Sequence, residues 1–239
     1  MKKEEILSKI TNEVLVSCQA YNDNPFNNAD DMAKMAISAV LGGSIGIRCN
    51  SPENVSAIRK AVGDDIIIIG IWKIVEGDNP VYITTTMDAV DQLVSAGSQI
   101  IALDCTDRIN AYGYKGFDLV KQIKEKYPDL VIMADCATFD EALKAKEVGV
   151  DIISSTLSGY TADTAYKKND EPDFEMIKKM SEIDGVHLIA EGKIWTREEA
   201  IRAFEAGAKT LVIGSSITNP EYITRRFITA TNKYFKGGK

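Results

Sequence analysis

Charged side chains stand at the ends of several buried-looking apolar runs. Lys73 follows "IIIIGIW", Arg48 ends "SIGIR", Asp135 ends "LVIMAD" and Glu191 ends "VHLIAE". A lysine in an apolar pocket beside another cation can lose its proton near neutral pH, and carboxylates nearby can accept or return protons. These residue types together indicate proton transfer, although neighbouring carboxylates raise a lysine pKa again and leave the protonation state of Lys73 open.

Each of these residues also has an ordinary structural explanation. A lysine after a strand usually extends its ammonium to water. Asp135 could cap the helix predicted in "CATFDEA", and Arg48 could form a surface ion pair. These explanations would have to hold at several strand ends at once. A shared site is therefore the better interpretation if the strand ends converge.

Eight short, β-branched runs alternate with longer helical patterns along the chain. Successive runs end about 28 residues apart, which is the length that a strand, a helix and two turns require. The helical segments "TMDAVDQLVSAG", "TFDEALKAKEVG" and "TREEAIRAFEAG" each combine a threonine cap, early acids and a final glycine. The runs are "VLVSC", "SIGIR", "IIIIGI", "QIIALD", "LVIMAD", "DIISST", "VHLIAE" and "TLVIGS".

This repeated unit predicts an α/β protein with a (β/α)₈ TIM barrel, formed as a single domain by residues 1–239. An additional helix over about residues 3–12 is expected to cover the barrel floor. A doubly wound open sheet is the alternative fold. It is disfavoured because no G-x-G-x-x-G turn follows the first strand.

In a barrel of this kind the functional residues lie at the carboxyl ends of the strands. His187 stands near the start of its strand, so we expect a structural role for it at the opposite end. The sequence contains no His/Cys cluster, which argues against a transition-metal site, and no metal is predicted. The residues expected around the barrel mouth are Gln19, Arg48, Lys73, Asp104, Asp135, Thr156 and Glu191.

The loops after the seventh and eighth strands read "AEGKIWT" and "IGSSITNP". Barrels often bind phosphate at these two loops through backbone N–H groups. Lys193 and Arg197 could add positive charge there. The residues that could bring bare backbone close to an anion are Gly192, Gly214, Ser215 and Ser216.

The net charge of −7 argues against nucleic acid or an anionic membrane as a partner. The N-terminal "MKKEEILSKI" lacks the apolar core of a signal peptide, and no apolar run approaches a membrane span of roughly 18 residues. We therefore expect a cytoplasmic protein. The scattered Cys18, Cys49, Cys105 and Cys136 are expected to be buried, reduced thiols.

A series of short motifs resembles, in order and spacing, the N-acetylmannosamine-6-phosphate 2-epimerases. The resemblance extends from about residue 13 to residue 228 and is carried by "VSCQA", "GGSIGIR", "GIWK", "IALDCT", "MADCAT", "STLSGYT", "IAEGKI" and "GSSIT". It implies a (β/α)₈ barrel that interconverts N-acetylmannosamine 6-phosphate and N-acetylglucosamine 6-phosphate in sialic-acid catabolism. It also implies that no nucleotide or redox cofactor is needed.

The resemblance assigns catalytic roles to Lys73 and Glu191 and places Gln19, Arg48 and Asp135 in the pocket. The implied reaction opens the sugar ring, removes the proton at C2 and returns a proton to the other face. Lys73 would be the base or the returning acid, and Glu191 its partner. Asp135 would either orient Lys73 or serve the opposite face, and the sequence does not distinguish one base from two.

Two positions depart from the family pattern. The family reads "ITRP" after the eighth strand, with an arginine on the substrate phosphate, whereas this chain has Asn219 at that position. Asparagine can donate a hydrogen bond but carries no charge. Arg197 stands where the family has proline. Our hypothesis is that Arg197 or Lys193 partly restores the missing positive charge.

Two other functions compete with the epimerase. One is a different phosphate-binding barrel isomerase or synthase, and the other is a barrel that binds a sugar phosphate but has lost its activity. The last helix carries Tyr222, Phe227, Tyr234 and Phe235, more aromatic surface than one helix usually needs. These side chains fit a homodimer interface or packing against the barrel equally well.

Overall fold

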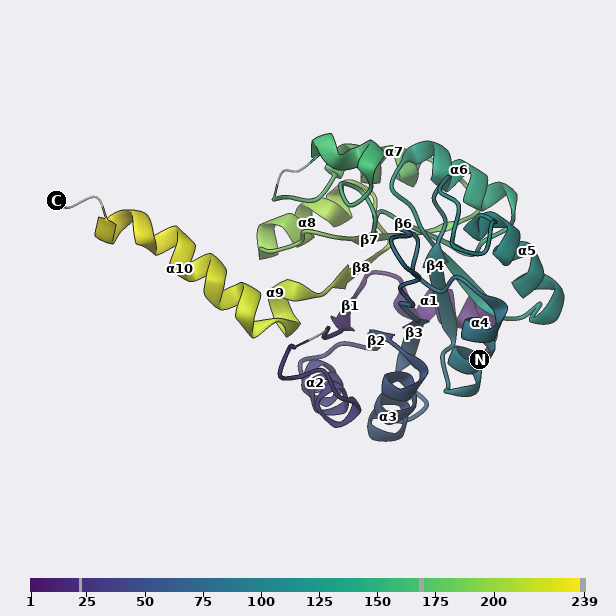
Figure 1. Cartoon of the computed structure of the whole chain (residues 1–239), viewed down its shortest axis with the longest axis horizontal. Coiled ribbons are helices and arrows are strands. Elements are labelled where there is room, and N and C mark those ends of the chain that lie inside the picture. The colour runs from purple at the N-terminus through teal and green to yellow at the C-terminus, as the bar shows by residue number, and fades with distance from the viewer. Residues whose placement is uncertain (22, 168–169, 237–239) are drawn as a thin grey trace.

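The computed structural model describes residues 1–21, 23–167 and 170–236, with side chains in these ranges up to Asn232. Eight parallel strands close into a barrel in sequence order, and the first pairs with the last in the register Glu13 to Thr210 (Figure 1). The predicted TIM barrel is confirmed, and the open-sheet alternative is wrong. The strands are β1 (Glu13–Cys18), β2 (Gly46–Asn50), β3 (Ile67–Ile71), β4 (Ile100–Asp104), β5 (Val131–Asp135), β6 (Ile152–Ser154), β7 (His187–Glu191) and β8 (Thr210–Ile213).

Helices alternate with the strands and surround the barrel. The threonine caps expected from the sequence are present: Thr86, Thr138 and Thr196 each accept a hydrogen bond from the amide three residues later. The helices are α1 (Lys3–Ile10), α2 (Ala29–Leu41), α3 (Pro52–Val62), α4 (Met87–Ser95), α5 (Gly116–Lys126), α6 (Phe139–Glu147), the 3₁₀ helix η1 (Ala162–Lys167), α7 (Phe174–Ser181), α8 (Arg197–Glu205), α9 (Ser215–Thr218) and α10 (Pro220–Lys236).

The buried residues form two layers, because successive side chains of a strand point to opposite faces. Ile67, Ile69 and Ile71 of β3 belong to the cluster inside the barrel. Ile6 and Ile10 of α1 join that cluster, so the predicted helix does cover the barrel floor. Burying each such aliphatic side chain stabilises the fold by about 1.5–3 kcal/mol.

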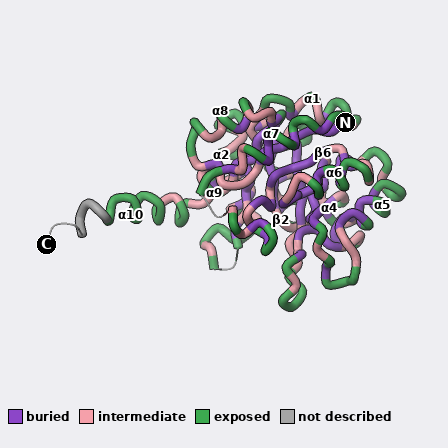
Figure 2. The backbone as a smooth tube through the Cα atoms, turned by 90° about the horizontal axis from the view of Figure 1, so that it is seen from above, coloured by how far each residue is buried: buried purple, intermediate pink, exposed green. Residues whose placement is uncertain are grey.

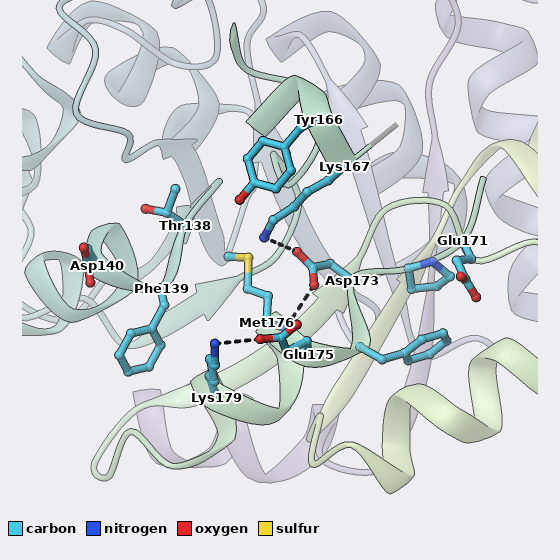
Figure 3. A pocket seen from close by; sticks show the side chains of 12 residues that line it. Thr138, Phe139, Asp140, Tyr166, Lys167, Glu171, Asp173, Glu175, Met176 and Lys179 are labelled. Carbon is cyan, nitrogen blue, oxygen red and sulfur yellow. Dashed lines mark hydrogen bonds and ion pairs between the residues drawn. The ribbon is translucent and has the colours of Figure 1, made fainter. Parts of the chain in front are cut away.

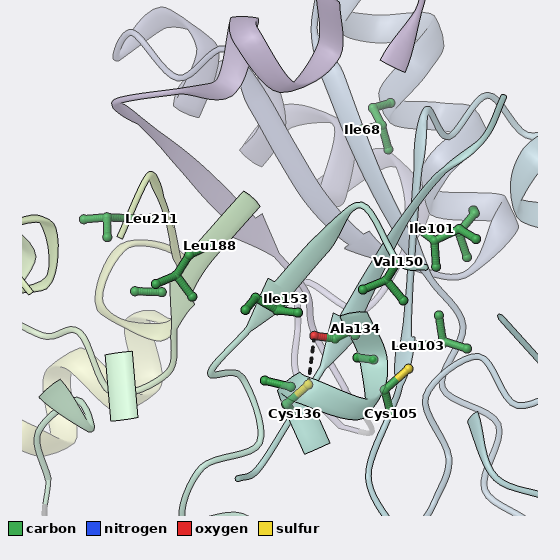
Figure 4. Packing of buried hydrophobic residues seen from close by; sticks show 14 of the residues in the cluster. Ile68, Ile101, Leu103, Cys105, Ala134, Cys136, Val150, Ile153, Leu188 and Leu211 are labelled. Atoms are coloured by element: carbon green, nitrogen blue, oxygen red, sulfur yellow. Dashed lines mark hydrogen bonds between the residues drawn. The ribbon is translucent and has the colours of Figure 1, made fainter. Parts of the chain in front are cut away.

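The second layer lies between the strands and the surrounding helices. Ile68, between the inward isoleucines of β3, packs in this layer, part of which is shown in Figure 4. Figure 2 shows the buried residues concentrated in the barrel, with exposed residues on the outer sides of the helices. Beyond the end of β3, Trp72 packs against this outer layer, and the next residue, Lys73, lines the cavity at the barrel mouth.

The four cysteines are buried, as predicted, and none is in a disulfide. Cys105 and Cys136 follow β4 and β5 and lie in the outer layer (Figure 4). Burial raises the pKa of all four thiols, that of Cys18 to about 12. They therefore stay protonated and unreactive.

His187 lies at the start of β7, at the floor end of the barrel, as predicted. Its Nε2 is 2.7 Å from Thr210 Oγ1, and that hydroxyl donates to the carbonyl of Ile10 in α1 at 2.6 Å. Burial lowers the pKa of His187 to about 4, so the imidazole is neutral at physiological pH. The histidine thus helps to join α1 to the barrel.

The last helix, α10, projects away from the barrel (Figures 1 and 2). Phe227 is 70% exposed and Ile228 54% exposed, so neither packs against its own barrel. The side chains of Tyr234 and Phe235, noted in the sequence, lie outside the described residues. Within the described ranges, no helix is both long and apolar enough to cross a lipid bilayer.

Candidate active site

A cavity of 530 Å³ opens at the carboxyl ends of the strands. Most of the side chains and loop residues assigned to the site from the sequence line it. Asp104, expected at the mouth, does not: it is buried and paired with Arg108 at 2.6 Å. The residues in the lining come from six different strand ends, so the convergence on which the shared-site interpretation depends is present. The assigned residues in the lining are Gln19, Arg48, Lys73, Thr156, Glu191, Gly192, Lys193, Gly214, Ser215 and Asn219.

Asp135 is also absent from the lining, because it lies below the cavity and is fully buried. Its two carboxylate oxygens each accept a hydrogen bond from Arg48, at 3.0 Å from Nη1 and 2.6 Å from Nη2. This two-point contact is the strongest arrangement for an arginine and a carboxylate. Asp135 therefore fixes the orientation of Arg48 and does not line the space open to a ligand.

Arg48 has a second carboxylate partner on the cavity side. Its Nη1 also donates to Glu191 Oε2 at 2.8 Å, and the hydroxyl of Thr156 donates to the same oxygen at 3.0 Å. The guanidinium is only 1% exposed, so its charge is balanced almost entirely by these two carboxylates. Strands β2, β5 and β7 and the loop after β6 thereby meet in one polar cluster.

The carboxyl of Glu191 has a pKa raised to about 7, and burial is the main cause. The negative charge of Asp135 raises it further, whereas Arg48, the hydrogen bond from Thr156 and the charge of Lys73 lower it. Near neutral pH this carboxyl can therefore either hold or release a proton.

Lys73 is held at the mouth, with its side chain directed toward the site. Its backbone N–H donates to Asn50 Oδ1 at 2.8 Å, and its Nζ donates to the hydroxyl of Tyr21 at 2.6 Å. Burial lowers the pKa of Lys73 to about 8, and Arg48 adds to this effect, while Glu191 and Asp135 oppose it. Near neutral pH most of Lys73 is then an ammonium, and a minor fraction is a free amine.

The loops after β7 and β8 form the other side of the cavity. Lys193 lines this side, whereas Arg197, the first residue of α8, is exposed and does not. The Lys193 backbone has φ +59°, a left-handed conformation that costs a residue with a side chain roughly 1–2 kcal/mol. Its Nζ donates to the carbonyl of Lys167 at 2.9 Å and lies 5.4 Å from the centre of the Tyr160 ring.

Several residues of the lining were not assigned from the sequence. Ser17 could have been inferred, because it lies two residues before Gln19 and therefore on the same face of the chain. Tyr82 had no such signal: the segment after β3 folds back antiparallel, with a bridge between Lys73 and Ile83, and returns it to the mouth. The unassigned residues include Ser17, Tyr21, Tyr82, Tyr160, Trp195 and Tyr222.

A larger hollow, of 740 Å³, lies on the outside of the barrel between the start of α6, η1 and α7 (Figure 3). Its charged residues form ion pairs, Lys167 with Asp173 at 2.5 Å and Lys179 with Glu175 at 2.7 Å. None of the strand-end residues faces it. Size alone would therefore identify the wrong hollow as the active site.

Among the described residues, no group of three or more histidine, cysteine, aspartate or glutamate side chains is arranged to hold a metal ion. The chemistry that the mouth offers is acid–base chemistry, from an amine and a carboxyl whose pKa values both lie near neutrality.

Sequence comparisons agree with this geometry. A family model described as "Putative N-acetylmannosamine-6-phosphate epimerase" matches residues 32–233. A protein from Caldanaerobacter subterraneus subsp. tengcongensis is 44% identical over 225 residues, covering 94% of this chain and 93% of that protein. One from Clostridioides difficile is 39% identical over 225 residues, covering 94% of this chain and 98% of its own length. Both bear the corresponding 2-epimerase description.

Solved structures show the same relationship. The N-acetylmannosamine-6-phosphate 2-epimerase from Clostridium perfringens has a TM-score of 0.88 and 36% identity, covering 94% of this chain and 96% of that one. Thiamine phosphate pyrophosphorylase from Pyrococcus furiosus has a TM-score of 0.63 at 16% identity, covering 92% and 93% of the two chains. At that identity, the second likeness shows a common fold alone.

The paired burial of Arg48 and Asp135 generates a stability prediction. Asp135→Asn should lower the free energy of unfolding by about 3 kcal/mol, because it leaves a buried guanidinium with one charged partner in place of two. Asp107→Asn is the matched control: Asp107 pairs with Lys115 and Lys144 but is 43% exposed, so about 1 kcal/mol or less is expected. Urea unfolding measures both, and equal losses in the two variants would contradict the prediction.

Proposed function

The chain belongs to the N-acetylmannosamine-6-phosphate epimerase family, and from that premise we propose that it interconverts N-acetylmannosamine 6-phosphate and N-acetylglucosamine 6-phosphate. The enzyme is then an isomerase that inverts one carbon, C2. The observation that carries the proposal is the pairing of Lys73 and Glu191 at one cavity, with pKa values near 8 and 7. Groups with pKa values in this range can remove and return a proton at C2 near neutral pH.

The reaction begins with opening of the sugar ring, which exposes C1 as a carbonyl and makes the C2 proton acidic. We assign the free amine of Lys73 as the base that removes this proton. Glu191, when protonated, donates a hydrogen bond or a proton to the developing oxyanion at C1 or returns the proton at the other face. Each such acid–base group contributes roughly 10²- to 10⁴-fold to the rate.

Arg48 supplies a fixed positive charge for the enolate that forms between these two groups. Its Nη1 donates to Glu191 and its orientation is set by Asp135, so its position needs no reorganisation during the reaction. We therefore propose that Asp135, assigned to catalysis from the sequence, acts through Arg48. Gln19 and Thr156 line the same cavity and are assigned to the sugar oxygens.

The loops after β7 and β8 are assigned to the phosphate. Gly192, Gly214 and Ser215 bring backbone to the cavity, and Lys193 is the cation on that side. Asn219, in the lining at the position of the family arginine, can donate a hydrogen bond without charge. The phosphate is thus expected to depend more on Lys193 than it would in a relative that has the arginine.

The proposed proton transfers leave the oxidation state of the substrate unchanged overall, so no redox cofactor is required. A phosphorylated amino sugar is an intracellular metabolite, and we propose that the enzyme works in the cytoplasm, in sialic-acid and amino-sugar catabolism. Nucleic acid is not an expected partner of a chain with net charge −7. We also propose that residues 1–239 act as one barrel domain with α10 as its extension.

A barrel that binds the sugar phosphate without turning it over is disfavoured, because both proposed acid–base residues are present and face the cavity. Another phosphate-binding barrel enzyme is disfavoured by the relatives, since three of them that are 39–44% identical to this chain bear the 2-epimerase description.

We further propose a homodimer. The support is α10, which projects from the barrel and carries Tyr222, Phe227 and Ile228, 47%, 70% and 54% exposed. An unpaired helix with this much apolar surface is poorly stable in water by itself.

The function is tested by incubating the protein with N-acetylmannosamine 6-phosphate in D₂O. The C2 epimer should form with deuterium at C2, because the proton that returns comes from groups in exchange with solvent. Lys73→Ala should lower turnover by about 100-fold or more, whereas Lys144→Ala, at an exposed lysine on α6, should leave it unchanged. Turnover without deuterium incorporation, or near-normal turnover by Lys73→Ala, would rule out this mechanism.

The phosphate assignment is tested with Lys193→Met and Arg197→Ala. Lys193→Met should raise KM for the sugar phosphate about tenfold with little change in kcat, since it removes a charge that binds ground state and transition state alike. Arg197→Ala should leave KM unchanged, because its side chain does not line the cavity. If Arg197→Ala raised KM and Lys193→Met did not, Arg197 would be the phosphate-binding cation instead of Lys193.

The homodimer is tested by sedimentation equilibrium of the full chain. The wild type and Thr229→Glu should sediment as dimers, and Phe227→Glu should shift the protein toward the monomer, because it places a charge on an apolar face. A monomeric wild type at micromolar concentration would contradict the proposal.

A further inference from the structure

We propose that Tyr21 is a positioning residue of this reaction, whose hydroxyl holds the amine of Lys73 at the cavity and links it to β1. The inference rests on the proposed function, because it assigns Lys73 as the base. Tyr21 lies three residues after β1 and lines the cavity. Neither the strand pattern nor the family motifs single it out.

The observation that carries the proposal is a chain of hydrogen bonds that ends at Lys73. Gln19 Nε2 donates to Ser17 Oγ at 2.8 Å, the Tyr21 hydroxyl donates to Gln19 Oε1, and Lys73 Nζ donates to the Tyr21 hydroxyl at 2.6 Å. Ser17 belongs to β1, so the far end of the chain is part of the rigid barrel. The amine of Lys73 is thereby tied to the scaffold through two side chains.

Tyr21 contacts Lys73 in a second way, because Nζ lies 4.5 Å from the centre of the Tyr21 ring. Such a distance is within the range of a cation–π contact. The ring therefore favours the ammonium, and the hydroxyl directs one of its N–H bonds. Both contacts favour one position of a side chain that otherwise has four rotatable bonds and a large rotamer entropy.

The direction of the hydrogen bonds suits a base. Since the Tyr21 hydroxyl gives its proton to Gln19, it can only accept from Lys73, whether Lys73 is an ammonium or a free amine. Burial raises the pKa of the Tyr21 hydroxyl well above its usual value, so it stays neutral and does not compete as a base. The free amine then has one N–H fixed by Tyr21, and its lone pair remains available to the C2 proton.

The charged and titratable groups around this pair come from several elements. Arg48 of β2, Asp135 of β5 and Glu191 of β7 act on Lys73, and Arg48, Glu191 and Tyr82 act on Tyr21. Among the described contacts, the hydrogen bond that Lys73 Nζ makes is the one it donates to the Tyr21 hydroxyl. A purely structural role is poorly supported, because Tyr21 as a whole residue is 42% exposed and only its hydroxyl end is enclosed, between Gln19 and Lys73.

Tyr21→Phe tests the proposal, since it keeps the ring and removes only the hydroxyl. We expect kcat to fall about tenfold while KM changes less than about twofold, because the loss affects the base and leaves binding intact. The pKa of Lys73 should fall by about half a unit, since the ammonium loses a hydrogen-bond acceptor. The pH profile of kcat should shift toward lower pH accordingly. Tyr112→Phe is the matched control, because Tyr112 is 49% exposed, donates to Glu76 and lies outside the cavity lining.

A second measurement separates this inference from the proposed function. Titration of Lys73 by NMR, in protein labelled at lysine and assigned with Lys73→Ala, needs no substrate and compares wild type with Tyr21→Phe directly. A lower midpoint in Tyr21→Phe supports the contact even if the sugar phosphate proves not to be the substrate. An unchanged midpoint, or a Tyr21→Phe enzyme with wild-type kcat, would overturn the proposal. Equal thermal melting temperatures would exclude a folding defect as the cause of lost activity.

Discussion

The active site depends on one buried positive charge. Arg48 is 1% exposed, and isolation of such a charge from water would cost several kcal/mol without partners. Asp135 and Glu191 supply these partners from opposite sides, one fully buried and one at the cavity. The barrel brings these three residues into contact. Closure of β1 onto β8 places the carboxyl ends of β2, β5 and β7 at one mouth.

The same charge contributes to the acid–base properties of the two groups proposed to react, although burial is the larger cause. Burial, and then Arg48, lower the pKa of Lys73 to about 8, whereas burial and Asp135 raise the pKa of Glu191 to about 7 despite Arg48. The two values approach each other from ordinary positions about 6 units apart. Each of these two groups can thus gain or lose a proton near neutral pH.

Much of this could be predicted from the sequence, because strand alternation and helix caps are local signals. Together with the family motifs they identified the barrel, the helix beneath it and about half of the residues that line the cavity. They could not show that Asp135 lies beneath Arg48 and outside the cavity, since that depends on contacts across the barrel. Tyr82 and Tyr21 were missed because loop geometry, not periodicity, places them. The sequence also could not predict that α10 projects from the barrel. An amphipathic helix has the same residue pattern whether it packs on its own barrel or on a partner.

The most direct test of this account is the pH dependence of kcat/KM for N-acetylmannosamine 6-phosphate with the unmodified protein. The account predicts a bell-shaped profile with limbs near pH 7 and 8, belonging to Lys73 and Glu191 as a coupled pair. The active form carries one proton on the Lys73–Glu191 pair. At lower pH the pair binds a second proton and activity falls, and at higher pH it loses its single proton and activity falls again. A profile that stays flat from about pH 6 to 9, with limbs near the ordinary values of about 4.3 and 10.4 for free glutamate and lysine, would contradict the account.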